Sequence, residues 1–320
     1  MDTILITGAA GFIGSHCAEA WLSRGAKVVG LDNFDPFYDR ALKKRNLDEI
    51  AAHPHAKNFR FVEADIRDAG ATLRAFEEAK PTAVLHLAAR AGVRPSIKEP
   101  ALYMAVNVEG TVNLFEAARQ TGVQRFLMAS SSSVYGNNEK VPFAETDDVS
   151  GPISPYAASK RACELAAHTW HNLYRMPIAC LRFFTVFGPR QRPDLAIMKF
   201  LKLVAAGEPI PMFGDGGMSR DFTFIDDIVA GVLAADGAIE KHGLRTWNLG
   251  GHHPVMLRDM IATIGRVVGK APVIDRLPEQ PGEVQRTYAD LTRSKADLGF
   301  EPKTSFEEGV RKQWAWLQAR

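Results

Sequence analysis

The first half of the chain alternates short apolar runs with longer amphipathic stretches. Four stretches have apolar positions at helical spacing and predict helices at Ile13–Arg24, Asp68–Ala79, Leu102–Thr121 and Tyr156–Tyr174. Runs rich in β-branched residues predict strands at Thr3–Thr7, Lys27–Leu31, Phe59–Glu63, Ala83–Leu87, Arg125–Ala129 and Pro177–Phe183. Strands and helices that alternate in this way indicate an α/β fold with a parallel sheet covered on both faces. Because such crossovers are right-handed, we expect a doubly wound sheet.

The pattern changes after Phe183, where glycine, proline and arginine cluster in FGPRQRPD and FGDGGMSRD. Helices are expected at Ile225–Ala235, Leu257–Val268 and Ser305–Leu317, the last opening with a Ser305–Glu308 capping box. We expect a first domain over residues 1–183, with residues 221–249 returning to its sheet near Asp221–Phe224 and Thr246–Leu249. Residues 184–320 would mainly form a smaller lobe that closes over the sheet.

Composition narrows the class of protein. The chain has 320 residues, 46% of them hydrophobic and 24% charged, with a net charge of +2. That charge is too small to favour a nucleic acid or an anionic membrane as partner, and no apolar run is long enough to span a bilayer. Cys17, Cys163 and Cys180 form no CxxC pair, which favours a reducing cytoplasm. His168 and His171 fit a solvated helix face better than a metal site.

A glycine-rich turn joins the first strand to the first helix. In ITGAAGFIGSH, Gly8, Gly11 and Gly14 have a G-x-x-G-x-x-G spacing, and Phe12 and Ile13 open the helix. Glycines permit close backbone approach to a pyrophosphate, and the helix N-terminus offers N–H groups and a positive dipole end. The alternative is a structural turn that binds nothing, because a glycine pattern alone is weak evidence.

The end of the second strand favours the dinucleotide interpretation, that is, a Rossmann fold that binds NAD. Asp32, followed by Asn33, lies at the distance where a carboxylate can accept hydrogen bonds from the adenosine ribose. The same carboxylate would repel the 2′-phosphate of NADP, so NAD is favoured. Asp65 and Ile66 follow the third strand and are placed at the adenine. Residues at the end of the fourth strand complete this part of the predicted cofactor site: Leu87, Ala88 and Ala89.

Candidate catalytic residues follow the fifth strand. Tyr156 and Lys160 are four apart on a predicted helix, so both side chains share one face. A phenol is a weak base at neutral pH, and a nearby ammonium and a cationic nicotinamide both favour the phenolate. An ordinary surface helix is the alternative. Ser131, in ASSSSVYG at the carboxyl end of a strand, would hand a proton between the substrate and Tyr156. Its serine neighbours can instead cap backbone groups.

Five motifs in order, TGAAGFIG, LAARAGVR, ASSSSVYG, YAASK and RDFTFIDD, resemble the extended short-chain dehydrogenase/reductases that act on nucleotide sugars. The resemblance covers essentially the whole chain. It implies an NAD that stays bound and is regenerated in each turnover, and a triad of Ser131, Tyr156 and Lys160. It also implies that Asn107, in VNVEGT, supports the lysine at the cofactor site. Members of the family usually dimerise through two helices of each subunit, here around Leu102–Thr121 and Tyr156–Tyr174.

Two further features of the resemblance concern the reaction. Dehydratases and decarboxylases of the family carry an acid where this chain has Ser133, and those that make 6-deoxy sugars precede it with another where this chain has Ser132. Without that acid, 4-epimerisation of a UDP-sugar becomes the better interpretation. LRFFTVFGPRQRPD, GVRPS and FDPFYD resemble the members that epimerise UDP-glucuronate, with Thr185 and Arg192 as the pair that receives the sugar carboxylate. For Arg192, a solvated loop arginine is the alternative.

The resemblance also implies the remaining substrate contacts. Arg220 would bind the diphosphate, and Glu283 the uridine ribose, although the family often has Asp and a nearby Arg at that place. The other predicted substrate-binding residues are Arg94, Ser132 and Phe213. Two alternatives stay open: a UDP-glucose/UDP-galactose 4-epimerase in which Thr185 and Arg192 are incidental, and a non-catalytic NAD(H)-sensing protein on the same fold.

Overall fold

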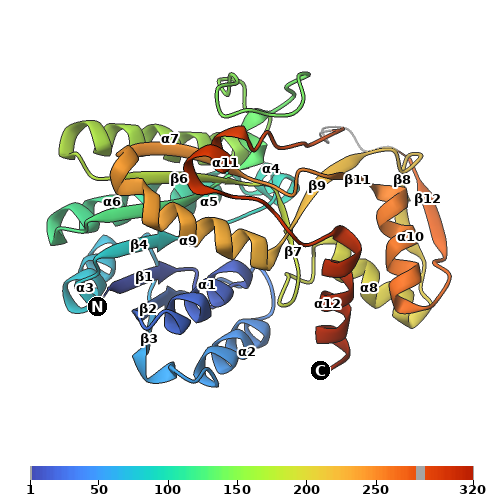
Figure 1. Cartoon of the computed structure of the whole chain (residues 1–320), viewed down its shortest axis with the longest axis horizontal. Helices are drawn as coiled ribbons and strands as arrows, with labels where there is room; N and C mark the ends of the chain where they lie inside the picture. The colour runs from blue at the N-terminus through green and yellow to red at the C-terminus, as the bar shows by residue number, and fades with distance from the viewer. Residues whose placement is uncertain (1, 279–284, 320) are drawn as a thin grey trace.

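A seven-stranded parallel sheet forms the centre of the molecule (Figure 1). The computed structural model describes residues 2–278 and 285–319. The strands lie in the order β10 (Leu244–Leu249), β6 (Ile178–Phe183), β5 (Arg125–Ser131), β4 (Ala83–His86), β1 (Thr3–Thr7), β2 (Lys27–Asp32) and β3 (Phe59–Glu63). Every neighbouring pair is parallel. The predicted α/β doubly wound fold is confirmed, and the strand order reverses between β1 and β4.

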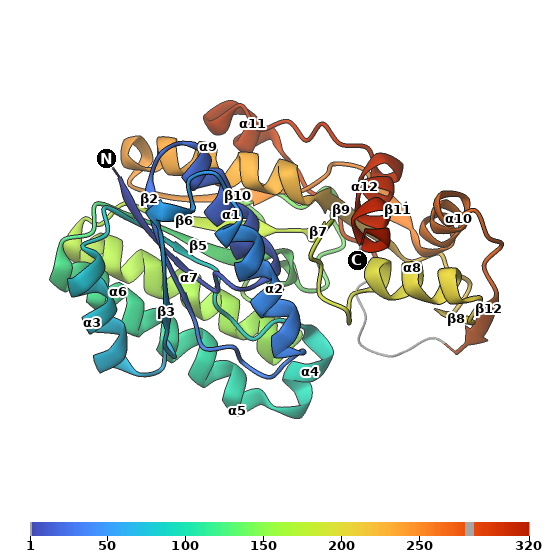
Figure 2. The same ribbon diagram turned by 90° about the horizontal axis from the view of Figure 1, so that it is seen from below.

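Helices cover both faces of this sheet, as the two views together show (Figures 1 and 2). One face carries α3 (Ala69–Ala79), α6 (Gly110–Thr121) and α7 (Pro155–Tyr174); the other carries α1 (Phe12–Ser23), α9 (Ile225–His242) and, beside α1, α2 (Arg40–Ala51). Strand side chains alternate between the two layers. Ile4 and Ile6 therefore belong to one buried apolar cluster and Leu5 to the other. This two-sided burial explains why the strands are almost continuously apolar.

Most predicted elements agree with the structure to within a few residues, but the predicted helix at Leu102–Thr121 is composite. It begins with α5 (Pro100–Tyr103), passes through a π-helical turn, η2 (Met104–Glu109), and continues as α6. Such turns often mark functional sites, and this one contains Asn107. Four helices of the described chain were not predicted from the sequence: α2, α4 (Val93–Lys98), α8 (Ala196–Ala206) and α11 (Thr292–Leu298).

The second lobe is built from two small sheets and three helices. One sheet has the order β11 (Pro254–Met256), β9 (Ser219–Phe224), β7 (Thr185–Phe187), and the other pairs β12 (Ile274–Leu277) with β8 (Ile210–Phe213). In Figures 1 and 2, α8, α10 (Leu257–Val268) and α12 (Phe306–Gln318) surround these sheets, and α11 (Thr292–Leu298) lies beside α9. The expected capping box opens α12, where the Glu308 N–H donates to the Ser305 hydroxyl at 3.3 Å.

The expectation that Asp221–Phe224 returns to the central sheet is wrong, because these residues belong to β9. Thr246–Leu249 does lie in the central sheet, within β10. A buried carboxylate explains the difference. Asp221 accepts N–H bonds from Gly251 at 2.9 Å and Ala289 at 2.8 Å, which tie β9 to the second lobe. Burial raises the pKa of Asp221 to about 6. A domain division at residue 183 remains a proposal.

A buried ion pair joins α7 to β6 beneath the carboxyl end of β5. Both Arg182 and Glu164 are almost fully buried, and the guanidinium donates to the carboxylate at 2.8 and 2.9 Å. The hydroxyl of Ser130 donates to the same carboxylate at 2.6 Å. Breaking such a pair leaves an uncompensated charge in the interior.

We expect Glu164→Ala to lower the free energy of unfolding by about 3–5 kcal/mol, because Arg182 would remain buried without its partner. Urea denaturation followed by circular dichroism measures the change. The matched control is Glu116→Ala, which removes an exposed pair with Arg119 on α6 and should cost less than about 1 kcal/mol. Equal effects of the two substitutions would contradict the prediction.

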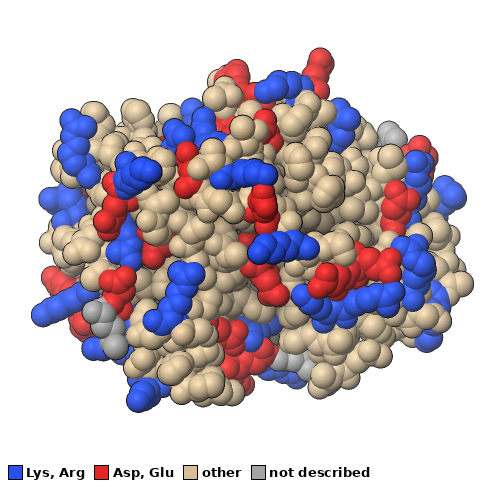
Figure 3. Space-filling view, viewed as in Figure 1, with Lys and Arg blue, Asp and Glu red and all other residues tan. Residues whose placement is uncertain are grey.

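The surface carries both signs of charge, and lysines and arginines alternate with acidic residues over the face seen in Figure 3. Within residues 2–278 and 285–319, none of the helices combines the length and the apolarity that crossing a membrane would require.

Candidate active site

A cavity of about 510 Å³ opens at the carboxyl ends of the central strands. It extends across the point where the strand order reverses, which is where open α/β sheets bind their ligands. Eighteen of the predicted site residues line it: Gly8, Gly11, Phe12, Ile13, Gly14, Asp32, Asn33, Asp65, Ile66, Leu87, Ala88, Ala89, Ser131, Ser132, Tyr156, Lys160, Thr185 and Arg192. Residues predicted to bind the cofactor, to catalyse and to bind the sugar therefore share one cavity.

The glycine turn has no room for side chains. Gly8 has a φ of +71°, and a Cβ added there would lie 2.8 Å from the backbone nitrogen of Ala88. A Cβ on Gly14 would lie 2.2 Å from the carbonyl oxygen of Gly8. Helix α1 follows at Phe12 without a side-chain cap, so its first N–H groups are available to an anion. This cradle fits the pyrophosphate of a dinucleotide.

Polar residues gather where the ends of β2 and β3 meet. Asp32 is buried and accepts the N–H of Phe34 at 2.8 Å, while Asn33 donates to Asp65 at 2.9 Å. Hydrogen bonds from Arg67, the largest cause, lower the pKa of Asp65 to about 2. Lys43, on α2, lies 3.6 Å from the Asp32 carboxylate. The carboxylates of this group can accept hydrogen bonds from an adenosine, as the sequence predicts.

The three candidate catalytic residues come from β5 and the first turns of α7. Ser154 caps that helix by accepting the Ala157 N–H at 3.1 Å, which places Tyr156 and Lys160 at its start. The buried Lys160 ammonium donates to the carbonyl oxygen of Ala129 in β5 at 2.8 Å. Ser131 accepts the Ser133 N–H at 3.1 Å and opens the short helix η3 (Ser132–Tyr135). A base, an ammonium and a hydroxyl thus face one cavity.

Asn107, which the resemblance assigns to the support of the lysine at the cofactor site, is not itself among the cavity-lining residues. Its amide accepts the N–H of Arg90 at 2.8 Å, donates to the carbonyl oxygen of Arg90 at 3.0 Å and donates to the Ser159 hydroxyl at 2.9 Å. Asn107 therefore fixes the backbone that leads into the cavity and joins it to α7, one residue before Lys160. We propose a positioning role for it in place of direct cofactor contact.

The predicted sugar-binding residues fall into two groups. Thr185 and Arg192 line the cavity close to the catalytic residues. Arg94, on α4 (Val93–Lys98), and Phe213, at the end of β8, are not among the lining residues, but they contact each other across the two lobes at 5.5 Å. Arg220, on β9, also lies outside the lining and donates to the carbonyl oxygen of Ser219 at 3.0 Å. The prediction for Glu283 lies outside the described residues.

Several charged and aromatic cavity residues escaped the sequence analysis. They are Asp35, Phe37, Tyr38, Lys43 and Arg90. Four of them belong to the motifs FDPFYD and LAARAGVR, but their residue types alone do not predict a contact with a ligand. Lys43 lies on the unpredicted helix α2. Across the described ranges, no group of three or more His, Cys, Asp and Glu residues could hold a metal ion.

A histidine lies behind the catalytic residues at the end of β4. The ring of His86 bonds Thr7 at 2.7 Å and Thr111 at 2.9 Å, and it is buried. Because the Thr111 hydroxyl donates to the Asn107 carbonyl oxygen, its oxygen accepts from Nε2 of His86. The Thr7 oxygen already accepts the N–H groups of Leu87 and Ala88, so its hydroxyl donates to Nδ1 and the ring is neutral. Burial, assisted by the charge of Lys160, lowers the pKa of His86 from 6.5 to about 3.

This shift predicts a loss of stability in acid. Below pH 6.5 the unfolded chain binds a proton at His86 that the folded protein does not bind, so the folded state loses up to about 1.4 kcal/mol per pH unit. Urea unfolding at pH 7 and pH 5 measures the change. Compared with the wild type, His86→Gln should have a shallower dependence of unfolding free energy on pH, and an unchanged dependence would refute the prediction.

Known proteins resemble this chain throughout its length. A family model described as GDP-mannose 4,6 dehydratase matches residues 5–313. A probable UDP-glucuronate 4-epimerase of Rhizobium meliloti is 40% identical over 98% of this chain and 96% of its own. The crystal structure of UDP-glucuronic acid 4-epimerase from Bacillus cereus, in complex with UDP-glucuronic acid and NAD, has a TM-score of 0.91 at 34% identity and covers 99% of both chains.

A UDP-glucose 4-epimerase from Thermotoga maritima, solved with UDP-glucose, has a TM-score of 0.88 at 31% identity and covers 99% of both chains. The family match, the fold and the arrangement of the cavity agree with the resemblance found in the sequence. This chain belongs to the GDP-mannose 4,6-dehydratase family of extended short-chain dehydrogenase/reductases.

Proposed function

We propose that the protein is an NAD-dependent 4-epimerase that converts UDP-glucuronate to UDP-galacturonate through a transient 4-keto sugar. One observation carries the choice of sugar: Thr185 and Arg192 line the same cavity as Ser131, Tyr156 and Lys160. A hydroxyl and a guanidinium suit a carboxylate. The probable UDP-glucuronate 4-epimerase of Rhizobium meliloti and the UDP-glucuronic acid 4-epimerase of Bacillus cereus support the same substrate.

The cofactor site accounts for the redox part of the reaction. The glycine turn at Gly8–Gly14 and the start of α1 would hold the pyrophosphate of NAD, and Asp32 would hold the adenosine ribose. When bound there, NAD supplies a hydride acceptor and donor for carbon 4 of the sugar. A carboxylate at the ribose would repel the 2′-phosphate of NADP, so the position of Asp32 supports NAD over NADP.

The chain's own residues move the proton and hold the sugar. The phenolate of Tyr156 removes the proton of the 4-hydroxyl, directly or through Ser131, and returns it after the sugar has turned. The amino group of Lys160, fixed against β5, belongs to the same cavity as Tyr156, where an ammonium favours the phenolate. Arg220 would anchor the diphosphate while the sugar presents its other face. The protein therefore contributes the orientation of the sugar and the transfer of its proton.

The short helix η3 argues for epimerisation rather than dehydration. A dehydratase needs an acid beside the keto sugar, and this chain presents Ser132 and Ser133 there. The Ser133 hydroxyl accepts a hydrogen bond from Ser131 at 3.1 Å. A serine hydroxyl is too weak an acid to assist elimination as a carboxyl group does.

Incubation of the purified protein with UDP-glucuronate, and separately with UDP-glucose, tests the proposal. Chromatography should show UDP-galacturonate from the first substrate, while absorbance at the NADH band reports reduction of the bound cofactor. Conversion of UDP-glucose alone would favour the UDP-glucose/UDP-galactose alternative. A protein that reduces its NAD with neither sugar would instead be an NAD(H)-sensing protein.

We also propose a homodimer and a cytoplasmic location. Leu165, Leu173 and Tyr174 are exposed on α7, one of the two helices through which the family usually dimerises. The three cysteines are unpaired and buried, which agrees with a reducing compartment. Sedimentation of the purified protein tests the dimer, and a monomer at micromolar concentration would contradict it.

A further inference from the structure

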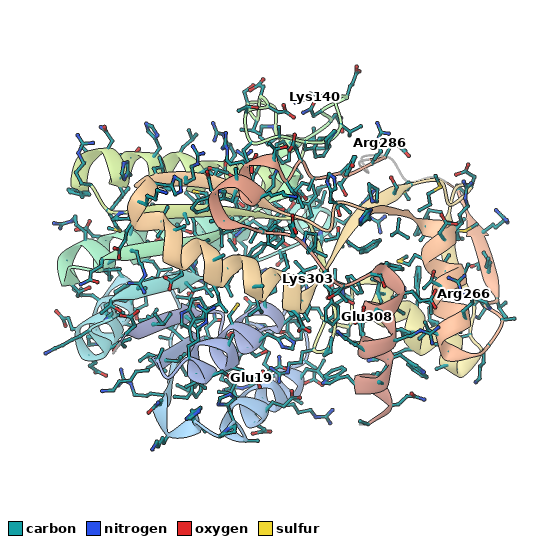
Figure 4. The ribbon with its side chains drawn as sticks, viewed as in Figure 1. Glu19, Lys140, Arg266, Arg286, Lys303 and Glu308 are labelled. Atoms are coloured by element: carbon teal, nitrogen blue, oxygen red, sulfur yellow. The ribbon has the colours of Figure 1, made fainter. Side chains whose placement is uncertain are left out.

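Arg192 lies on a loop that the nucleotide-binding half of the molecule holds in place. Two residues earlier, Arg190 has a φ of 65° and a largely buried side chain. Its guanidinium pairs with Glu49 of α2 and, at 2.7 Å, with Glu19 of α1, labelled in Figure 4. The carbonyl oxygen of Pro189 accepts a hydrogen bond from His16, also on α1, at 3.0 Å. The backbone that carries Arg192 is therefore fixed by α1 and α2.

The side chain of Arg192 is then held on two sides. Asp194 accepts from its Nε at 3.0 Å and from one terminal nitrogen at 2.8 Å. The guanidinium carbon lies 4.8 Å from the centre of the Phe37 ring. A guanidinium has five N–H donors, so the two bonds to Asp194 leave three N–H groups for other partners. The Phe37 ring attracts the cation without accepting a conventional hydrogen bond from these three groups.

Phe37 is itself fixed by the cofactor half of the cavity. Its N–H donates to Asp35 at 2.9 Å, and the same carboxylate oxygen accepts from Arg90 at 2.9 Å. The guanidinium of Arg90 lies 5.0 Å from the Phe37 ring and is also bound to Glu99 at 2.6 Å. One aromatic ring thus contacts two guanidinium groups, one paired with carboxylates near the NAD site and one beside the predicted sugar site.

We propose that Phe37 is a positioning residue that determines the preference for an acidic sugar. The proposal rests on the proposed function. By holding the guanidinium of Arg192 against its ring, Phe37 keeps the remaining N–H groups directed at the sugar carboxylate. A ring attracts a cation more strongly than an aliphatic side chain of similar size does, so the preference depends on aromaticity rather than on apolar volume.

The test compares the dissociation constants of UDP-glucuronate and UDP-glucose, measured by calorimetry on the NAD-loaded protein. These ligands differ only at carbon 6 of the sugar, which is a carboxylate in UDP-glucuronate and a hydroxymethyl group in UDP-glucose. Phe37→Leu should raise the dissociation constant of UDP-glucuronate by about fivefold to thirtyfold and change that of UDP-glucose by less than about twofold. Phe37→Tyr should keep the wild-type ratio of the two dissociation constants. The matched control is Phe34→Leu, which removes a ring that contacts Arg40 at 4.4 Å in the same segment and should leave the ratio unchanged.

The proposal would be overturned if Phe37→Leu weakened the binding of both nucleotide sugars equally, or the binding of neither. A Phe37→Tyr variant that behaves like Phe37→Leu would also overturn it, because the ring would then not be the cause. A wild-type protein that does not turn over UDP-glucuronate refutes the proposed function instead, and the two failures are therefore distinguishable.

Discussion

Arg192→Ala is expected to lower kcat/KM for UDP-glucuronate by about a hundredfold and to divert part of the intermediate to a decarboxylated pentose. The first effect follows from the loss of a charged partner for the sugar carboxylate in the cavity. The second follows from the chemistry of the intermediate. Oxidation at carbon 4 produces a β-keto acid, which loses carbon dioxide when the carboxylate bond aligns with the π system of the ketone.

A guanidinium that holds the carboxylate near the plane of the ring opposes that alignment. Chromatography of the nucleotide sugars after a complete reaction measures the share of pentose. Asp215→Ala is a suitable control, because it removes a charge from a loop of the second lobe that lies outside the cavity lining. Unchanged turnover without pentose would mean that Arg192 does not bind the sugar carboxylate.

Tyr156→Phe is expected to lower kcat by about a thousandfold, the magnitude typical of a lost general base. The substitution removes one oxygen and retains the ring, whose edge-to-face contact with Tyr103 at 6.3 Å is preserved. The bound NAD content and the dissociation constant of UDP-glucuronate should therefore change little. Absorbance at the NADH band in a single turnover separates loss of chemistry from loss of binding.

A reduction of less than tenfold in kcat would assign the proton transfer to another group, and Ser131→Ala would be the next variant to measure. A parallel loss of NAD from Tyr156→Phe would instead indicate that the phenol mainly holds the cofactor. Either result is distinguishable from a folding defect by the circular dichroism spectrum and the melting temperature.

Local features of the chain were sufficient to predict the central fold. The inner strands of the sheet lie between two helical layers, so they are mostly apolar, and the amphipathic helices between strands leave few other topologies. The turn at Gly8–Gly14 could also be interpreted from local sequence, because its strand, turn and helix are continuous along the chain. Tyr156 and Lys160 share a face by helical spacing alone, and both line the cavity.

Contacts between distant segments were decided only by the tertiary structure. Asp221 belongs to a motif visible in the sequence, yet its bonds to Gly251 and Ala289 place β9 in the second lobe. The pairing of Phe37 with Arg192 depends on how the loop after β7 returns to α1 and α2. The periodicity of apolar residues predicts which face of a helix or strand a residue occupies. Which residue it contacts on another element depends on the packing of the whole chain. The sequence by itself therefore determined the sheet and the cofactor turn, and the folded chain decided what holds the predicted carboxylate-binding arginine.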